Sequence, residues 1–139
     1  MNLTPEQARQ RLVTARALRL ATVSAAGQPH LVPITFAVEG DHLYFAIDHK
    51  PKSTTALRRL KNIRDSPRVS VLADFYDDDW TQLWWVRADG HAEIWESGPG
   101  CEHALDLLAA RYPQYAETRP AGAVVAITID LISGWSYRD

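Results

Sequence analysis

The run from Pro29 to Val38 alternates at every second residue, which is the period of a β-strand. A tight turn at residues 39–41 leads into a second strand, expected over 42–47, and another strand, 18–24, precedes the run. Three strands joined by short turns predict an antiparallel meander. Pro33 lies inside the run and cannot donate a ladder hydrogen bond, so we expect it at a sheet edge or a bulge.

The remaining elements follow from capping signals and periodicity. Thr4, Pro5 and Gln7 form a capping box with proline at the first helical position, which predicts a helix to about Ala15. We further expect a helix over 53–64, strands over 69–76 and 82–95, a helix over 97–112, a loop over 112–122 and a last strand over 123–132. Asp89-Gly90 could make a hairpin turn or a bulge in one bent strand, and spacing leaves both open.

This order of elements predicts the fold class. Residues 1–139 should form a single, mainly β (α+β) domain with six antiparallel strands, about three helices and a closed or half-closed barrel.

No apolar run approaches the roughly 20 residues that span a bilayer, so no membrane partner is expected. The one cysteine, Cys101, excludes an intrachain disulfide and indicates a cytoplasmic protein. The histidines lack ligand spacing, so no metal is expected.

Positive charge is concentrated in one stretch. The chain has 15 Lys and Arg and a net charge of -2. Between Lys50 and Arg68 there is one acid, Asp65, and the basic residues are Lys50, Lys52, Arg58, Arg59, Lys61, Arg64 and Arg68. Such a cluster on an otherwise slightly acidic chain indicates either an anion site or a solvated basic helix face. Nucleic acid is disfavoured as a partner by the net negative charge.

Several motifs together resemble one superfamily. They are G-Q-P-H (27–30), KPKSTT (50–55), RRLKNIRDSPRVSVL (58–72) and WVRADGHAE (85–93). In this order they resemble the flavin-binding split-barrel superfamily, which includes pyridoxamine 5′-phosphate oxidase. The segments DDDWTQLWWVR (77–87) and RYPQY (111–115), with the terminal Trp135, are most similar to the small oxidoreductases that use the deazaflavin coenzyme F420.

The resemblance implies a homodimer of six-stranded split barrels with cofactor at the shared interface, and one continuous bent strand through Gly90. Oxidases of the pyridoxamine type carry R-x-V-L-x-K on the second strand, whereas the stretch 32–36 here lacks both cations. The expected phosphate ligands are therefore Lys50, Lys52 and Arg59, with hydroxyl and backbone donors from Ser53 and Thr54 at a helix N-terminus.

The cofactor ring needs a flat apolar slot. The expected lining residues are Val32, Pro33, Ala46, Ile47 and Asp48, mostly through backbone atoms. The tryptophans Trp84, Trp85 and Trp135 could come from the partner subunit, or could simply be barrel core and dimer interface. Trp84 and Trp85 are adjacent on a strand and should point to opposite faces.

The expected function is F420-dependent hydride transfer with a small conjugated organic substrate. The alternatives are an FMN-binding oxidase or flavin reductase of the pyridoxamine 5′-phosphate oxidase-like type, and a non-enzymatic cofactor-binding protein. Hydride transfer needs no protein acid or base at the transferred hydrogen, so the sequence identifies no catalytic residue.

Overall fold

The computed structural model describes residues 1–47 and 54–138 of the chain, and the side chains of residues 54–56 lie outside that description. The elements in chain order are α1 (Pro5–Thr14), β1 (Leu18–Val23), β2 (Pro29–Ile34), β3 (Ala37–Glu39), β4 (His42–Ala46), α2 (Thr54–Asp65), β5 (Arg68–Phe75), the short 3-10 helix η1 (Trp80–Gln82), β6 (Trp84–Trp95), α3 (Pro99–Arg111), α4 (Pro113–Glu117) and β7 (Val124–Ser136). The predicted α+β class with an antiparallel sheet is confirmed.

The seven strands form one antiparallel sheet in the order β2-β1-β5-β6-β7-β4-β3. Its two edges, β2 and β3, are consecutive in the sequence and separated only by Thr35 and Phe36. Since an extended chain advances about 3.6 Å per residue, Ile34 and Ala37 can be at most about 11 Å apart. The sheet must therefore curl until its edges meet, which makes a split barrel. Pro33 lies on the edge strand, where its missing N–H costs no ladder bond, as predicted.

The predicted strand over 29–38 is broken into β2 and β3, and side chains from the end of α3 explain the break. The Tyr112 hydroxyl accepts a hydrogen bond from the Phe36 N–H (3.0 Å) and lies 3.0 Å from the Phe36 carbonyl oxygen. Arg111 Nη1 donates to the same carbonyl at 3.0 Å, with its guanidinium 4.3 Å from the Phe36 ring centroid. These side chains form hydrogen bonds with the N–H and the carbonyl oxygen of Phe36, which a neighbouring strand would otherwise bond.

The first helix begins as its capping box predicts. The Thr4 side chain accepts from the Gln7 N–H, and the Gln7 side chain accepts from the Thr4 N–H. Ala8 and Leu12 are fully buried and join the barrel core.

The segment 112–122 was expected to be a loop, but it contains the short helix α4, whose first residue, Pro113, suits a helix N-terminus.

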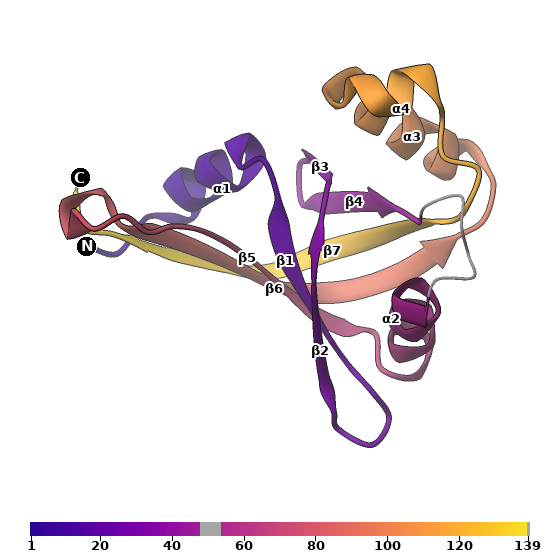
Figure 1. The fold of residues 1–139 in the computed structure, drawn as a ribbon, viewed down its shortest axis with the longest axis horizontal. Coiled ribbons are helices and arrows are strands. Elements are labelled where there is room, and N and C mark those ends of the chain that lie inside the picture. Colours follow the sequence, from indigo (N-terminus) through magenta and orange to yellow (C-terminus); the bar gives the residue numbers. More distant parts are fainter. Residues whose placement is uncertain (48–53, 139) are drawn as a thin grey trace.

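Strands β5, β6 and β7 run far beyond the barrel as a long arm that ends at η1, with both chain termini beside it (Figure 1). β6 is one continuous strand through Gly90, with a register shift against β7 between Asp89 and Gly90. The bulge is therefore correct and the hairpin alternative is wrong. A Cβ atom at Gly90 would lie 2.2 Å from the Thr128 carbonyl oxygen, so only glycine fits.

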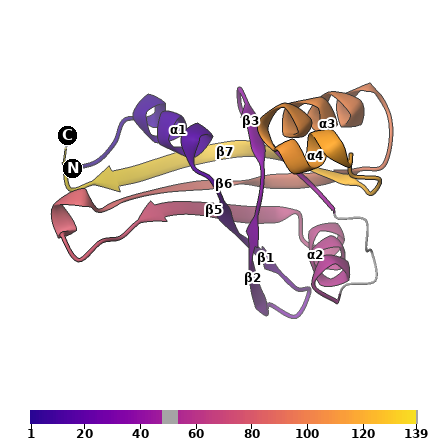
Figure 2. The same ribbon diagram turned by 45° about the horizontal axis from the view of Figure 1, so that its top comes forward.

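The core lies inside the curled sheet, with a smaller cluster outside it. The main core joins inward side chains of the strands to Leu12 of α1 and Ile63 of α2. The second cluster packs α3 onto the outer face of β4 and β7, through residues such as Leu105, Tyr44 and Val124. No helix of the described residues covers the outer face of β1, β5 and β6, as the turned view shows (Figure 2). None of the helices in the described residues is long and apolar enough to cross a membrane.

Replacing Gly90 by alanine should destabilise the fold by about 3 kcal/mol, because the new methyl group collides with the backbone of β7. The matched control is Gly40→Ala. Gly40 has φ 60°, and a Cβ atom added there would have no heavy atom within 4 Å. The loss of stability should therefore come only from the backbone conformation and amount to about 1 kcal/mol. Urea denaturation of both variants measures the difference. Equal losses would contradict this account of the bulge.

Candidate functional site

Helix α2 carries four of the five described basic residues of the 50–68 cluster and is fixed on β1 by a buried polar contact. Asn62 Nδ2 donates to Thr22 Oγ1 at 3.0 Å, and the two residues are only 4% and 3% exposed. Ile63, the next residue, is buried in the main core. The helix therefore has a set rotation about its axis, and this rotation directs Arg59 across the gap between β2 and β4.

Arg59 is half-buried at this gap. Its guanidinium carbon lies 5.6 Å from the centroid of the Phe45 ring on β4. Burial lowers the pKa of Arg59, and the Tyr115 phenol on α4 acts in the opposite direction. Tyr115 in turn shares a 3.0 Å hydrogen bond between its hydroxyl and that of Thr35, in the link between β2 and β3. We call the set Arg59, Phe45, His30, Thr35 and Tyr115 the seam cluster.

Two buried polar atoms of the seam cluster have no hydrogen-bond partner among the described residues. They are Nε of Arg59 and Nδ1 of His30. The pKa of His30 is lowered by burial first, and then by the charges of Arg58 and Arg59, so its imidazole is neutral at pH 7. An unsatisfied buried polar atom costs about 1–3 kcal/mol, so both atoms would gain from a ligand that bonds to them.

The donor set of the seam cluster suits an anionic ligand. A guanidinium binds phosphate or carboxylate oxygens through its planar fork, and the neutral imidazole can accept or donate one hydrogen bond. The Phe45 ring is only 1% exposed and lies beneath the Arg59 guanidinium, so it supports Arg59 and is not open to a ligand. The charged and polar groups present therefore fit the anionic part of a phosphorylated cofactor.

Of the residues predicted for the ring slot, four are described. Val32 is half-buried and packs on the main core, and Pro33 is exposed. Ala46 packs on the second cluster. The Ile47 side chain is buried in the core and its N–H is bonded to the Ala123 carbonyl oxygen, so it offers a ligand only its carbonyl oxygen.

The other predicted ligands fall mainly outside the description. Asp48, Lys50, Lys52 and Ser53 lie outside the described residues, and so does the side chain of Thr54, the residue at which α2 begins. The phosphate assignment to Lys50 and Lys52 therefore stays a prediction. Of the predicted phosphate ligands, Arg59 is the one whose surroundings are defined.

The predicted tryptophans are far from the seam cluster within one chain. Trp84 packs on the main core with the Arg11 guanidinium 5.1 Å from its ring centroid, while Trp85 pairs with Trp135 across β6 and β7. The expectation that Trp84 and Trp85 point to opposite faces of the sheet is thus confirmed. The slot residue Ala46 pairs with Val124 on β7, which pairs in turn with Trp95 near the end of β6. Trp95 is ten residues from Trp85 along β6, so about 33 Å of strand separates Trp85 from the position next to Ala46.

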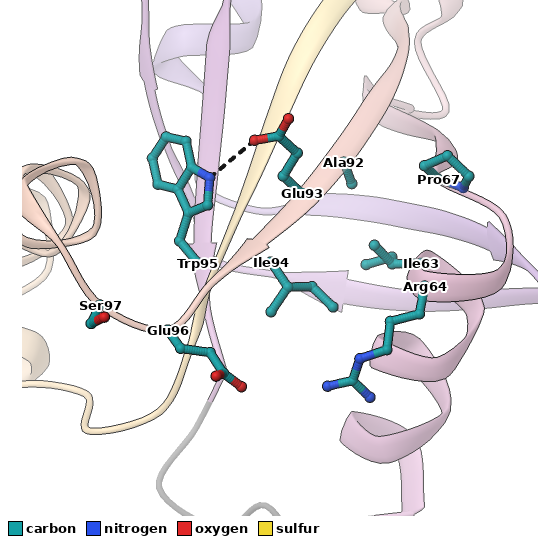
Figure 3. A pocket seen from close by; sticks show the side chains of 9 residues that line it. All are labelled: Ile63, Arg64, Pro67, Ala92, Glu93, Ile94, Trp95, Glu96 and Ser97. Carbon is teal, nitrogen blue, oxygen red and sulfur yellow. Dashed lines mark hydrogen bonds between the residues drawn. The ribbon is translucent and has the colours of Figure 1, made fainter.

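A hollow of about 760 Å³ lies between α2 and the end of β6 (Figure 3). Arg64 stands on one side of its opening and Glu96 on the other, above a floor that includes Ile63 and Ile94. Glu93 also lines it and accepts from the Trp95 indole N–H at 3.1 Å. Two carboxylates beside one guanidinium make this groove a poor phosphate site.

The sequence reasoning did not assign the aromatic and hydroxyl members of the seam cluster to the site. Phe45 is an ordinary inward strand residue by pattern, and Tyr115 entered only as part of the 111–115 motif. They come close to Arg59 only because the sheet curls, and no local sequence pattern indicates that curling. Among the described residues, no group of three or more His, Cys, Asp or Glu side chains could hold a metal ion.

Comparison with known proteins gives one family. Residues 4–136 match the family described as pyridoxamine 5′-phosphate oxidase. Similar solved structures include a FAD-binding protein from Mesorhizobium loti, at 24% identity and TM-score 0.74, covering 96% of this chain and 95% of that one. A conserved hypothetical protein from Mycobacterium tuberculosis has 24% identity and TM-score 0.77, with 97% and 86% covered. None of the curated proteins matches the chain.

A third similar structure is HutZ, a heme storage protein from Vibrio cholerae, at 18% identity and TM-score 0.72, covering 95% of this chain and 94% of that one. At such identities these likenesses establish the fold alone.

Replacing Thr22 by valine should lower the free energy of unfolding by about 2 kcal/mol, because the buried Asn62 amide loses its acceptor. The double variant Thr22→Val/Asn62→Leu should lose less than the sum of the two single variants, since no polar group is then left unpaired. Thr118→Val, an exposed site on the same chain, is the control. Urea denaturation measures the four variants against the original protein, and additive losses would show that the contact does not hold α2.

Proposed function

The chain belongs to the pyridoxamine 5′-phosphate oxidase family, and on that premise we propose that it is a cytoplasmic oxidoreductase that binds a phosphorylated flavin-type cofactor at the seam cluster. The preferred cofactor is F420. When bound, its deazaflavin ring supplies hydride transfer to or from a small conjugated organic substrate. The observation that carries the proposal is Arg59, a half-buried cation at the curled sheet's seam whose Nε has no hydrogen-bond partner among the described residues.

Charge supports F420 over FMN. The F420 tail carries glutamate carboxylates beyond its phosphate, and so needs a longer basic surface. On α2, Arg58 and Arg64 are exposed and have no carboxylate of the described residues within 4.0 Å, whereas Lys61 is paired with Asp65 at 2.9 Å. The stretch 32–36 lacks the two cations that the pyridoxamine oxidases use, which argues against that activity.

FMN remains the alternative cofactor, in an oxidase or flavin reductase, because similar folds include FAD-binding proteins. A non-enzymatic cofactor-binding protein is the other alternative, and the heme storage protein among the similar structures is an example of this fold in a storage role. Both alternatives use the same seam cluster and differ in whether substrate is turned over.

The residues of the chain have three tasks in the proposed reaction. Arg59 holds the anionic part of the cofactor and thereby fixes the position of the ring. The neutral His30 contributes one hydrogen bond without adding charge beside the ring. The hydroxyls of Thr35 and Tyr115 are exposed or partly exposed at the seam and can orient a polar group of the substrate.

We also propose that the chain is a homodimer. The uncovered outer face of the sheet exposes Leu31, Leu72 and Leu131, with exposed fractions of 66%, 36% and 60%. Leu72 lies opposite Arg19 on one neighbouring strand and Arg87 on the other, and Leu131 lies opposite Asp89. Apolar side chains among charges of both signs suit a self-complementary interface.

Titration of the purified protein with F420 and with FMN should show saturable quenching of F420 fluorescence and much weaker quenching of FMN. The physical reason is the basic surface of α2, which matches the longer anionic tail of F420. Binding should weaken as salt rises, because exposed cations are screened. Tight FMN binding without F420 binding would overturn the preferred cofactor. Binding without turnover across a broad set of electron acceptors would favour the non-enzymatic alternative.

Arg59→Ala should raise the dissociation constant of the bound cofactor at least about tenfold, because a buried charged hydrogen bond to phosphate is lost. Arg59→Lys should recover only part of this loss, since an ammonium lacks the planar fork. Lys61→Ala, two residues further along α2 and paired with Asp65, is the control and should change the constant less than about twofold. Fluorescence titration measures each variant. An unchanged constant for Arg59→Ala would refute the seam site.

A further inference from the structure

Strand β6 continues past the end of the strand that flanks it on one side. β5 pairs with β6 as far as His91, and one further bond, from the Ala92 N–H to the Pro67 carbonyl oxygen at 2.8 Å, closes this side. β7 pairs with the other side of β6 as far as Trp95. Residues 93–95 therefore have β7 on one side and no strand of the described residues on the other, so the end of β6 is an edge of the sheet.

The backbone of this edge presents groups that pair with no neighbouring strand. In an antiparallel ladder the N–H and the C=O of one residue point to the same side, and those of the next residue point to the opposite side. The Ala92 N–H points to Pro67, so the N–H and the C=O of Ile94 also point away from β7. Proline has no N–H, so Pro67 cannot donate to the Ala92 carbonyl oxygen. Three backbone groups, the C=O of Ala92 and both groups of Ile94, thus face outward from the edge.

The edge runs along the hollow between α2 and the end of β6 (Figure 3). Residues 92–97 form one wall of this hollow, and Ile63 and Pro67 lie on the side of α2. Its volume of about 760 Å³ is within the range of about 300–1,000 Å³ that ligand pockets have. Three residues in extended conformation span about 10 Å. The hollow is therefore large enough for a short extended segment beside β6.

The side chains along the edge indicate what such a segment carries. Glu93 and Trp95 lie on the outer face of β6, whereas Ile94 packs on the main core. A residue paired with Ile94 therefore points to the apolar floor, and its two neighbours point outward, beside Glu93 and Trp95. A carboxylate pairs best with a basic side chain, and an indole ring attracts a cation to its face. The complementary pattern is an aliphatic residue between two basic ones.

The charges at the hollow agree with this pattern. Glu93 accepts from the Trp95 indole N–H at 3.1 Å, which fixes the position of its carboxylate. Neither Glu93 nor Glu96 has a Lys, Arg or His side chain of the described residues within 4.0 Å. Arg64 is the one cation among the described residues that line the hollow, so the two carboxylates leave it an excess of negative charge. Charged groups protect a sheet edge from unwanted pairing, and these carboxylates favour basic segments over acidic ones.

We propose that the end of β6 binds an extended segment of a partner protein by β-strand addition, and that this segment carries an aliphatic residue between two basic residues. The backbone groups of Ile94 and Ala92 supply the hydrogen bonds, and Glu93 selects the charge of the segment. The contact needs neither the seam cluster nor the proposed dimer, so its failure would leave both of those proposals unchanged.

A peptide titration tests the contact. The probe is Thr-Lys-Ile-Lys-Thr, acetylated and amidated, added to ¹⁵N-labelled protein. We expect a saturable shift of the Ile94 amide signal and slower hydrogen exchange of its N–H, with a dissociation constant below about 1 mM, because the N–H gains an acceptor. The second probe, Thr-Glu-Ile-Glu-Thr, should bind at least about tenfold more weakly, because its carboxylates lie beside Glu93.

Protein variants separate backbone pairing from charge, with the Trp95 indole signal as the reporter. Ile94→Pro removes the outward N–H without removing a bond to β7 and should raise the dissociation constant of the lysine probe at least about tenfold. Ile94→Val keeps the N–H and should change the constant less than about twofold. Glu93→Lys should reverse the preference, so that the glutamate probe binds more tightly than the lysine probe. Glu6→Lys makes the same change of net charge at an exposed position on α1 and should leave the preference as it is.

Hydrogen exchange of the free protein shows whether the edge is already occupied. An Ile94 N–H that is protected equally at every protein concentration means that the same chain pairs with the edge, and protection that rises with concentration means that a second copy does. Either result overturns the proposal, as does equal binding of the two probes or binding of neither. If Ile94→Pro does not fold, the reversal of preference by Glu93→Lys decides the outcome, and an unreversed preference refutes the contact.

Discussion

The structure depends on one topological constraint, the two-residue link between the outermost strands of the sheet. β2 and β3 lie at opposite edges of the strand order, yet Thr35 and Phe36 are all that separates them in the sequence. A flat seven-stranded sheet would hold those edges about 29 Å apart, at roughly 4.8 Å per strand spacing, and two residues cannot span that distance. Curling is therefore imposed by chain connectivity, and the enclosed apolar core follows from it.

The same link determines where a ligand can act. Because the edges of the sheet meet without pairing, the seam leaves polar groups that neither strand satisfies. Side chains from α3 and α4 supply some of the missing hydrogen bonds. Arg111 and Tyr112 bond to the backbone of Phe36, and Tyr115 bonds to the hydroxyl of Thr35. Arg59 reaches the seam from the other side, on a helix held by the buried contact of Asn62 with Thr22. Unpaired donors and acceptors thus gather where the barrel closes, and that is where we place the cofactor.

The sequence was informative wherever the signal was local. The capping box at Thr4, the edge position of Pro33, the opposite faces of Trp84 and Trp85 and the positions of the main strands and helices all follow from periodicity or backbone chemistry. The break at Phe36 was not predicted, because its cause, Tyr112, is 76 residues away in the chain. The short helix α4 was not predicted either, since five residues carry too little periodicity to read. Thr35, Phe45 and Tyr115 were not assigned to the site for the same reason, as only the tertiary fold brings them to Arg59.

The distance between the two groups of predicted site residues has a consequence for assembly. The slot residue Ala46 is in register with one end of β6 and the tryptophans Trp84 and Trp85 lie at the other end, about 33 Å away along the strand. A flavin-sized ligand cannot contact both groups in one chain. Either the tryptophans only stabilise the arm, or the cofactor site is shared between copies. The second interpretation agrees with the homodimer that we propose, and it gives a role to the exposed aromatic side chains at the end of the arm, Tyr76 and Trp80.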